Sequence, residues 1–220
     1  YEALLKEKVA TAGEELLSAL ELIKQYPKSV TFYGSAQLPE DNEYYKKAQR
    51  LAARTCELGY AVVSGGGPGI MEAANRGGYE TCGYSIGFNI ELPSEQVVNP
   101  YVTHGKNFQY FFTRKTALHF SSEVFLSFPG GFGTFDETFE LITLMQTGKS
   151  PRVPVILVGT DFWMPFVEVI SKVMLDTFKT ISAHDMDLFQ VVDDEDAIMD
   201  IIKHAPMRNA YKEMRAEKES

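Results

Sequence analysis

The residues best suited to chemistry in this chain lie between Pro129 and Glu137, which read Pro-Gly-Gly-Phe-Gly-Thr-Phe-Asp-Glu. The run before them, 123–128, has the aromatic and β-branched bias of a buried strand, and the run after them has helical periodicity. A helix start carries unpaired N–H groups and the positive end of the helix dipole, and glycines let an anion approach the backbone. We therefore expect a phosphate to bind at Gly130, Gly131 and Gly133, with the Glu137 carboxylate one helical turn further on.

The same residues also allow a purely structural interpretation. Thr134 and Glu137 have the spacing of a capping box, in which the glutamate only closes the first turn of its helix. For the glutamate, the motif alone leaves this alternative open. Three glycines within four residues are harder to explain, because a plain turn from strand to helix needs one glycine at most. The loop itself is therefore better explained by ligand binding.

Composition limits the class of protein. The chain has 220 residues, of which 45% are hydrophobic, and this is enough for one substantial core. It has no apolar run that could span a bilayer, so we expect a soluble protein without a membrane partner. The net charge of −9 disfavours a nucleic-acid partner, because such binding depends on Lys and Arg.

The sequence gives no sign of a metal or a cofactor. Cys56 and Cys82 lie in predicted helices, outside any Cys-x-x-Cys pair, and are expected to be separate structural thiols. This usage fits a reducing cytoplasm and argues against a disulfide scaffold or a zinc site. The four histidines are isolated from one another, so we assign none of them to metal binding or proton transfer.

Strand and helix patterns alternate along the chain. They predict an α/β fold: a Rossmann-like parallel sheet in a single domain, with helices covering both faces. The expected strands are 29–33, 60–64, 84–89, 101–104, 123–128, 153–158 and 189–192. The main expected helices are 2–25, 43–58, 70–81, 108–120, one from the glycine loop to Gly148, 163–178 and 194–203. The domain would occupy 29–204, after an N-terminal helix within 1–28 and before a charged tail at 205–220.

Three loops should meet at one edge of this sheet, where the carboxyl ends of parallel strands lie and where ligands bind. They are 33–36, the first glycine loop at 64–69, and the second glycine loop at 129–134. They supply the expected substrate-binding residues Gly34, Ser35, Gly65, Gly66 and Gly67. Neither glycine loop ends in Gly-Lys-Ser/Thr or completes Gly-x-Gly-x-x-Gly, so ATP hydrolysis and classical NAD binding are disfavoured. Glu72 and Asn75 follow the first glycine loop, and two interpretations stay open for them: contact with a ribose, or a first-turn charge and polar surface.

Three ordered motifs together resemble one known family. They are Ser64 to Asn75, Phe112 to Lys115, and Pro129 to Glu137. They are similar to the LOG (LONELY GUY) family, whose signature Pro-Gly-Gly-x-Gly-Thr-x-x-Glu is preceded by an Arg-Lys pair, and the length of the chain resembles the larger bacterial branch. The similarity runs from about residue 29 to residue 202. One departure is Gln37, where many relatives have a basic residue.

The resemblance implies a phosphoribohydrolase that cleaves the N-glycosidic bond of a nucleoside 5′-monophosphate, either AMP or a cytokinin riboside monophosphate. Arg114 and Glu137 then match the family's essential arginine and glutamate. Gly130, Gly131, Gly133 and Thr134 match its phosphate loop, and Lys115 joins the substrate-binding set. The resemblance further implies a homodimer or a higher homo-oligomer and no cofactor.

Two other functions stay open beside hydrolysis. A related group implies a non-catalytic carrier of a nucleotide or of molybdenum cofactor. The label lysine decarboxylase, sometimes attached to the family, would require a Schiff-base lysine. The best candidate, Lys115, follows Arg114 directly on a helix and so points about 100° away from it. We therefore do not expect pyridoxal chemistry.

Overall fold

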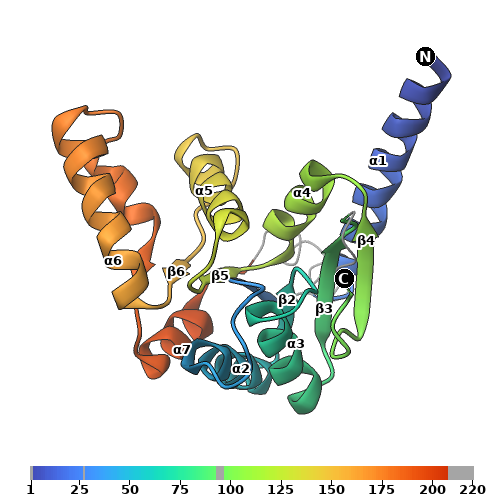
Figure 1. Cartoon of the computed structure of the whole chain (residues 1–220), viewed down its shortest axis with the longest axis horizontal. Coiled ribbons are helices and arrows are strands. Elements are labelled where there is room, and N and C mark those ends of the chain that lie inside the picture. Colours follow the sequence, from blue (N-terminus) through green and yellow to red (C-terminus); the bar gives the residue numbers. More distant parts are fainter. Residues whose placement is uncertain (1, 27, 93–96, 208–220) are drawn as a thin grey trace, which may run out of the picture.

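The chain folds around a parallel seven-stranded sheet, as the alternating pattern predicts (Figure 1). The computed structural model describes residues 2–26, 28–92 and 97–207, and its strand order is β4-β3-β2-β1-β5-β6-β7. The strands are β1 (Ser29–Tyr33), β2 (Ala61–Ser64), β3 (Ser85–Ile90), β4 (His104–Phe108), β5 (Val124–Ser127), β6 (Val155–Leu157) and β7 (Gln190–Val191). The α-helices are α1 (Glu2–Lys24), α2 (Glu43–Glu57), α3 (Ile70–Thr81), α4 (Phe111–Ser121), α5 (Phe132–Gln146), α6 (Thr160–Val169) and α7 (Glu195–His204).

Two hydrophobic cores lie on opposite faces of the sheet, because successive residues of a strand point to opposite sides. Val30 and Phe32 of β1 pack beneath α2, α3 and α7. Tyr33 of the same strand packs on the other side, with residues of α1, α4, α5 and α6. The predicted α/β fold, with helices on both faces of one parallel sheet, is confirmed.

The sheet places the candidate site at its topological switch point. From β1 the chain continues to β2 on one side, and β5 lies on the other side of β1, so the loops after β1 and β5 diverge and leave a crevice. The backbone N–H of Ser35 donates to the carbonyl of Pro129 at 3.0 Å, and the carbonyl of Ser35 accepts from the N–H of Ile70 at 2.9 Å. These two bonds join the three predicted loops at one rim.

Some predicted boundaries are wrong. The short strand expected at 101–104 is β4, and the helix expected from residue 108 begins at Phe111. β4 is an edge strand with mostly exposed side chains, held by backbone pairing to β3, so hydrophobic periodicity does not reveal it. The helix expected at 163–178 is α6 followed by a π-helical segment, Ile170–Thr177. Most of the predicted charged tail, from residue 208 onward, lies outside the described residues.

Helix α1 projects from the body of the protein, and its final third anchors it (Figure 1). Its buried residues, Ala19, Leu22 and Ile23, all lie near its C-terminal end. Glu15 adds a polar attachment, because its carboxylate accepts from the N–H of Gln109 at 2.7 Å and from the hydroxyl of Thr113 at 2.6 Å. Within the ranges given above, no helix is both long enough and apolar enough to cross a membrane.

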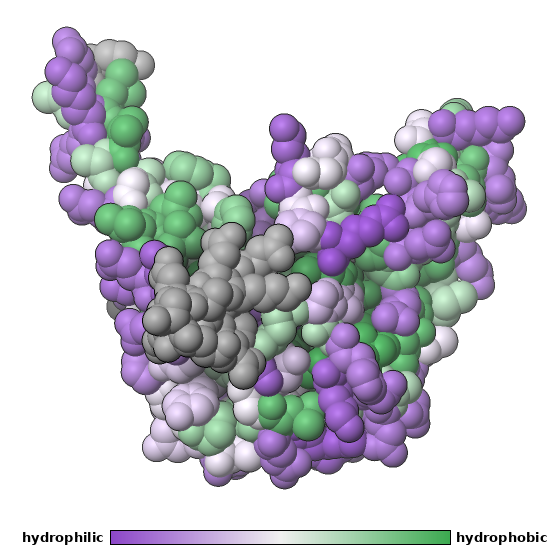
Figure 2. Space-filling view, turned by 180° about the vertical axis from the view of Figure 1, so that it is seen from behind, coloured by the Kyte–Doolittle hydropathy of each residue, from purple (hydrophilic) through white to green (hydrophobic). Residues whose placement is uncertain are grey.

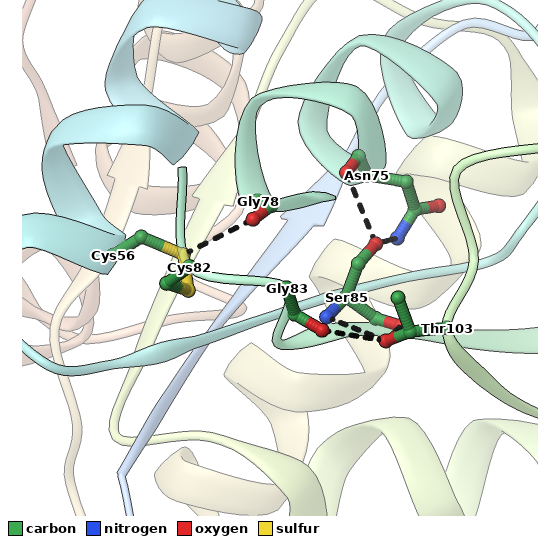
Figure 3. Close-up of a disulfide and its surroundings, with 7 residues drawn as sticks. All are labelled: Cys56, Asn75, Gly78, Cys82, Gly83, Ser85 and Thr103. Atoms are coloured by element: carbon green, nitrogen blue, oxygen red, sulfur yellow. Dashed lines mark hydrogen bonds between the residues drawn. A yellow bond between two sulfur atoms is a disulfide. The ribbon is translucent and has the colours of Figure 1, made fainter. Parts of the chain in front are cut away.

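The expectation of two separate thiols is wrong. Cys56 near the end of α2 and Cys82 just after α3 form a disulfide, with their Cα atoms 5.7 Å apart (Figure 3). The reason is the close packing of the two helices. A side chain on Gly77 would overlap the carbonyl of Gln49, so the α3 backbone lies directly against α2. Sequence spacing gives no sign of this approach, because the two cysteines are 26 positions apart.

Reduction of the disulfide should destabilise the protein by about 3 to 4 kcal/mol, the loop-closure entropy of a cross-link spanning about 26 residues. We expect urea unfolding of the native protein to shift to lower urea when dithiothreitol is added. Cys82→Ser should already show the shifted curve and should not respond to the reductant. Equal midpoints with and without reductant, or unlinked Cys56 and Cys82 peptides in a non-reducing digest, would contradict the cross-link.

Candidate active site

An arginine and a glutamate from neighbouring helices face each other at this rim. Nη1 of Arg114 in α4 donates to Oε1 of Glu137 in α5 at 2.9 Å, and the two side chains are only 8% and 12% exposed. Nε of Arg114 also donates to the carbonyl oxygen of Phe88 in β3 at 2.7 Å. This second bond fixes the plane of the guanidinium group. The fold therefore brings together the two residues that the sequence predicts to be catalytic.

The carboxyl group of Glu137 titrates under two opposing influences. Burial raises its pKa above that of an ordinary glutamate, while the charge of Arg114 and the hydrogen bond from it lower the pKa without cancelling the effect of burial. A carboxyl group whose pKa is shifted toward neutrality can both accept and release a proton under mild conditions. Glu137 is thus suited to general acid or general base chemistry.

A cavity of about 360 Å³ opens beside this pair. On one side it is lined by the start of α5, through Gly131, Gly133 and Thr134, and by Gly34 and Ser35 of the loop after β1. Ala36 and Gln37 of the same loop also line it, together with four large apolar side chains, those of Met71, Ile90, Leu92 and Phe111. The cavity lining therefore combines the start of α5, apolar side chains and the ion pair of Arg114 and Glu137.

The structure excludes the capping-box alternative. Gly131 is the N-cap of α5, and no described side chain caps the helix, so Thr134 lies inside the first turn rather than before it. The side chain of Glu137 is engaged with Arg114 instead. A helix start without a side-chain cap keeps unpaired N–H groups and a positive potential, and both favour a bound anion. Gly130 lies behind this start, where a side chain would overlap Thr134.

The first glycine loop lies behind the ion pair rather than on the cavity surface. A side chain on Gly65 would overlap the guanidinium group of Arg114, so the loop backbone lies against it. Gly66 and Gly67 are buried, and the described lining of the cavity contains neither of them. Their predicted contact with a substrate stays a prediction. The structure shows that this loop packs against the guanidinium group of Arg114.

Two other predicted substrate-binding side chains point elsewhere. The carboxylate of Glu72 accepts from the hydroxyl of Tyr45 in α2 at 3.0 Å. Nζ of Lys115 lies 3.1 Å from Asp136 and 2.6 Å from Glu140. Burial lowers the pKa of Lys115, but these two carboxylates outweigh burial and raise it. A lysine held protonated in this way is unsuited to forming a Schiff base, which agrees with the sequence argument against pyridoxal chemistry.

Sequence reasoning missed two features of the site. The apolar part of the cavity lining comes from separate segments, so no local sequence pattern predicts it. The nearest signal is the position of Ile90 and Leu92 directly after a predicted strand. The second is Asn75, for which a surface position was one open interpretation. It is fully buried and hydrogen-bonded to Ser64 and Ser85, so that interpretation is wrong.

Comparison with known sequences agrees with these motifs. The sequence profile of a family described as "Possible lysine decarboxylase" matches residues 71–202, more than half of the chain. The chain belongs to this family. Its LOG-type relatives include a cytokinin riboside 5′-monophosphate phosphoribohydrolase of Arabidopsis thaliana, 26% identical over 169 residues, with 74% of this chain and 77% of the relative covered. Another, of Rhodococcoides fascians, is 23% identical over 160 residues and covers 70% and 79%.

Comparison with solved structures shows the shared fold of this LOG-type chain. A molybdenum cofactor binding protein of Rippkaea orientalis superimposes with a TM-score of 0.60 and 21% identity, covering 81% of this chain and 96% of that chain. The molybdenum cofactor carrier protein of Chlamydomonas reinhardtii gives 0.54 and 23%, covering 80% and 96%. At these identities the likeness extends to the fold and not to the activity.

The ion pair generates a prediction about protonation. Arg114→Met removes the cation that lowers the pKa of Glu137, so burial should raise that pKa further. The folded protein would then hold the proton to higher pH than the unfolded chain does. The free energy of unfolding should therefore fall as the pH rises through the folded pKa. Urea unfolding from about pH 4 to about pH 9, together with carbon NMR of the Glu137 carboxyl group, would measure both effects.

The double variant Arg114→Met/Glu137→Gln is the control for this prediction. It removes the titrating carboxyl group and should show no such additional pH dependence. If the single and double variants lose stability in parallel as the pH rises, the pKa of Glu137 is not governed by Arg114.

Proposed function

We propose that this LOG-type protein hydrolyses the N-glycosidic bond of a nucleoside 5′-monophosphate, AMP or a cytokinin riboside monophosphate, to the free base and ribose 5-phosphate. One observation carries the proposal: the buried carboxylate of Glu137, 2.9 Å from Arg114, lies one helical turn beyond an uncapped helix start at the same cavity. The names of the relatives described above support it.

The chemistry of this bond explains why a carboxylate is needed. As the bond between C1′ and the base breaks, positive charge develops on the ribose and negative charge on the leaving base. A carboxylate near C1′ stabilises the developing cation and can accept a proton from an attacking water molecule. Because Arg114 holds Glu137 in one orientation, little reorganisation of that side chain is required in the transition state.

The start of α5 is suited to binding the 5′-phosphate of such a substrate. The N–H groups of the first turn of α5, near Gly131, Gly133 and Thr134, favour an anion. Glu137 follows Gly133 by four residues and Thr134 by three, about one turn or about 5 to 6 Å along the helix axis. A 5′-phosphate bound at the helix start would tether the sugar, and its binding energy would hold C1′ at the carboxylate. The apolar wall of Met71, Ile90, Leu92 and Phe111 is suited to the base.

The pair of buried charges also argues against a simple carrier. A protein that only binds an anionic cofactor gains no attraction from a carboxylate at the cavity surface, and the pairing with that carboxylate offsets the positive charge that Arg114 would otherwise offer the ligand. Here Glu137 is buried at some cost in desolvation and has Arg114 as its partner. A hydrolase requires such a group, and this favours hydrolysis over the carrier function found among proteins of the same fold.

Hydrolysis should be detected directly. We expect purified protein incubated with AMP or with isopentenyladenosine monophosphate to release free base and ribose 5-phosphate in equal amounts, measured by liquid chromatography. Glu137→Gln should lower kcat by about 10²- to 10⁴-fold, the usual contribution of a general acid or base. Arg114→Ala should also abolish turnover, because it removes the partner that orients Glu137.

Asp136→Asn is the matched control. Asp136 is adjacent in sequence, also acidic, and exposed, and it pairs with Lys115 rather than with Arg114. It should retain wild-type turnover. Full activity of Glu137→Gln would refute the role of that carboxylate. Tight nucleotide binding by the wild-type protein without any release of base would instead support a carrier.

We also propose that the protein self-associates through the outer surface of α4, α5 and α6. Large apolar side chains are exposed there: Phe112 is 59%, Phe120 58%, Phe132 97% and Phe166 41% exposed. These helices lie on the same face of the sheet as the projecting α1, whose inner side also carries apolar side chains (Figures 1 and 2). Exposed apolar side chains grouped on one face of a protein are typical of interaction sites. A second copy of the chain would cover it.

Light scattering after gel filtration should therefore give a mass of two or more chains. Phe120→Glu places a charge on the proposed interface and should lower the mass toward that of one chain. Tyr79→Glu is the control, because Tyr79 is similarly exposed, at 51%, but lies on α3 across the sheet. A monomeric wild-type protein, or dissociation by Tyr79→Glu alone, would contradict this surface.

A further inference from the structure

A cluster of buried polar side chains lies behind the first glycine loop, outside the cavity. It consists of Ser64 at the end of β2, Asn75 in α3, Ser85 at the start of β3, and Asn99. Ser64, Asn75 and Ser85 are fully buried, and Asn99 is 6% exposed. Burying polar groups costs free energy unless their donors and acceptors are paired. The arrangement of this cluster therefore needs an explanation.

The carboxamide of Asn75 uses all of its hydrogen-bonding capacity. Its oxygen accepts from the hydroxyl of Ser64 at 2.6 Å and from Nδ2 of Asn99 at 2.9 Å. Its nitrogen donates to the hydroxyl of Ser85 at 2.9 Å and to the carbonyl of Ile86 at 3.1 Å (Figure 3 shows Asn75 and Ser85). These four bonds fix the amide in one orientation and tie α3 to the ends of β2 and β3.

Asn99 extends the cluster to the glycine loop. The second hydrogen of its Nδ2 is donated to the carbonyl of Gly67 at 3.0 Å, and its backbone N–H donates to the carbonyl of Gly66 at 2.9 Å. The N–H of Gly66 in turn donates to the hydroxyl of Ser64 at 3.0 Å. Gly66 has a φ of 72°, a conformation that favours glycine. Hydrogen bonds to Ser64 and to Asn99 thus hold the backbone of the loop at Gly66 and Gly67.

The loop held in this way touches Arg114. The backbone of Gly65 leaves no room for a side chain on that residue, because the guanidinium group of Arg114 lies against it. Gly66 packs closely on Gly87 of β3, and the next residue, Phe88, provides the carbonyl that accepts from Nε of Arg114. The guanidinium group is therefore confined by the loop, by β3 and by Glu137.

We propose that Asn75 and Asn99 are positioning residues, which hold the 65–67 loop in the one conformation that keeps the Arg114 guanidinium beside Glu137. Neither side chain belongs to the described lining of the cavity, so they act through the loop and not on the ligand. The consequence for catalysis rests on the proposed function. The placement of Arg114 itself can be measured without any substrate.

Substitution of Asn99 separates hydrogen bonding from packing. Asn99→Asp keeps the shape of the side chain but removes both Nδ2 donors and brings a carboxylate toward two oxygens, those of Gly67 and Asn75. If Asn99 only fills space, aspartate should replace it well. If its hydrogen bonds position the loop, aspartate should be at least as harmful as alanine. Asn99→Ser, which keeps one donor, provides a milder variant should the others fail to fold.

The experiment uses two readouts on the full chain. The first is the Nε–H signal of Arg114 in nitrogen-15 NMR, assigned by its loss in Arg114→Lys. In Asn99→Asp and Asn99→Ala this signal should shift and should exchange faster with solvent. The second is steady-state hydrolysis of AMP, in which kcat should fall about 10- to 100-fold with a smaller change in KM, as expected when a catalytic group is misplaced by about 1 Å.

Thr31→Val is the matched control. Thr31 is equally buried, and its hydroxyl bonds those of Ser121 at 2.8 Å and Ser122 at 2.7 Å, at the other end of α4. This variant should lose stability but keep the Arg114 signal and kcat. An unchanged Arg114 signal in folded Asn99→Asp, or an equal shift in Thr31→Val, would overturn the proposal. A wild-type protein that hydrolyses neither AMP nor isopentenyladenosine monophosphate would refute the proposed function, while the Arg114 signal would still decide the positioning.

Discussion

A buried carboxylate is tolerable only while a cation shares its burial. The bond between Arg114 and Glu137, 2.9 Å long and nearly excluded from water, meets this requirement. Removing one partner of such a pair leaves an uncompensated buried charge and costs about 3 to 5 kcal/mol. Much of the surrounding structure, from the carbonyl of Phe88 to the backbone of Gly65, is arranged so that the guanidinium group has one available position.

The parallel sheet brings the loops around this ion pair to one edge. Three loops leave the carboxyl ends of β1, β2 and β5 and are joined through Ser35, which bonds both Pro129 and Ile70. The loop after β5 opens α5 at the cavity, while the loop after β2 supports Arg114 from behind. One glycine-rich loop therefore lines the cavity and the other packs against the guanidinium group of Arg114. Their similar composition has different structural consequences: the loop after β5 opens a helix without a side-chain cap, and the loop after β2 lets a side chain approach its backbone.

The sequence predicts the fold and the position of Glu137 for identifiable reasons, whereas Arg114 enters only through the family resemblance. Alternating apolar runs and glycine-ended helices indicate strands and helices of a parallel sheet, and the spacing from Gly133 to Glu137 is a local property of one helix. The edge strand β4 was misplaced because backbone pairing to β3, and not side-chain pattern, holds it. Contact with a ribose is one of two interpretations of Glu72, and Lys115 joins the predicted substrate-binding set through the family resemblance. In the structure they turn to Tyr45 and to Asp136 and Glu140, because a helix directs adjacent residues to different sides.

The sequence by itself determined the features that depend on neighbours along the chain. These are the glycine loops, the helix that carries Glu137, and the order of strands and helices. Tertiary structure alone decided which distant groups meet. It placed Arg114 against Glu137 across two helices, buried Asn75 among Ser64, Ser85 and Asn99, and joined Cys56 to Cys82. The physical reason is that burial and hydrogen-bond pairing are set by packing between elements, which the local sequence pattern does not encode.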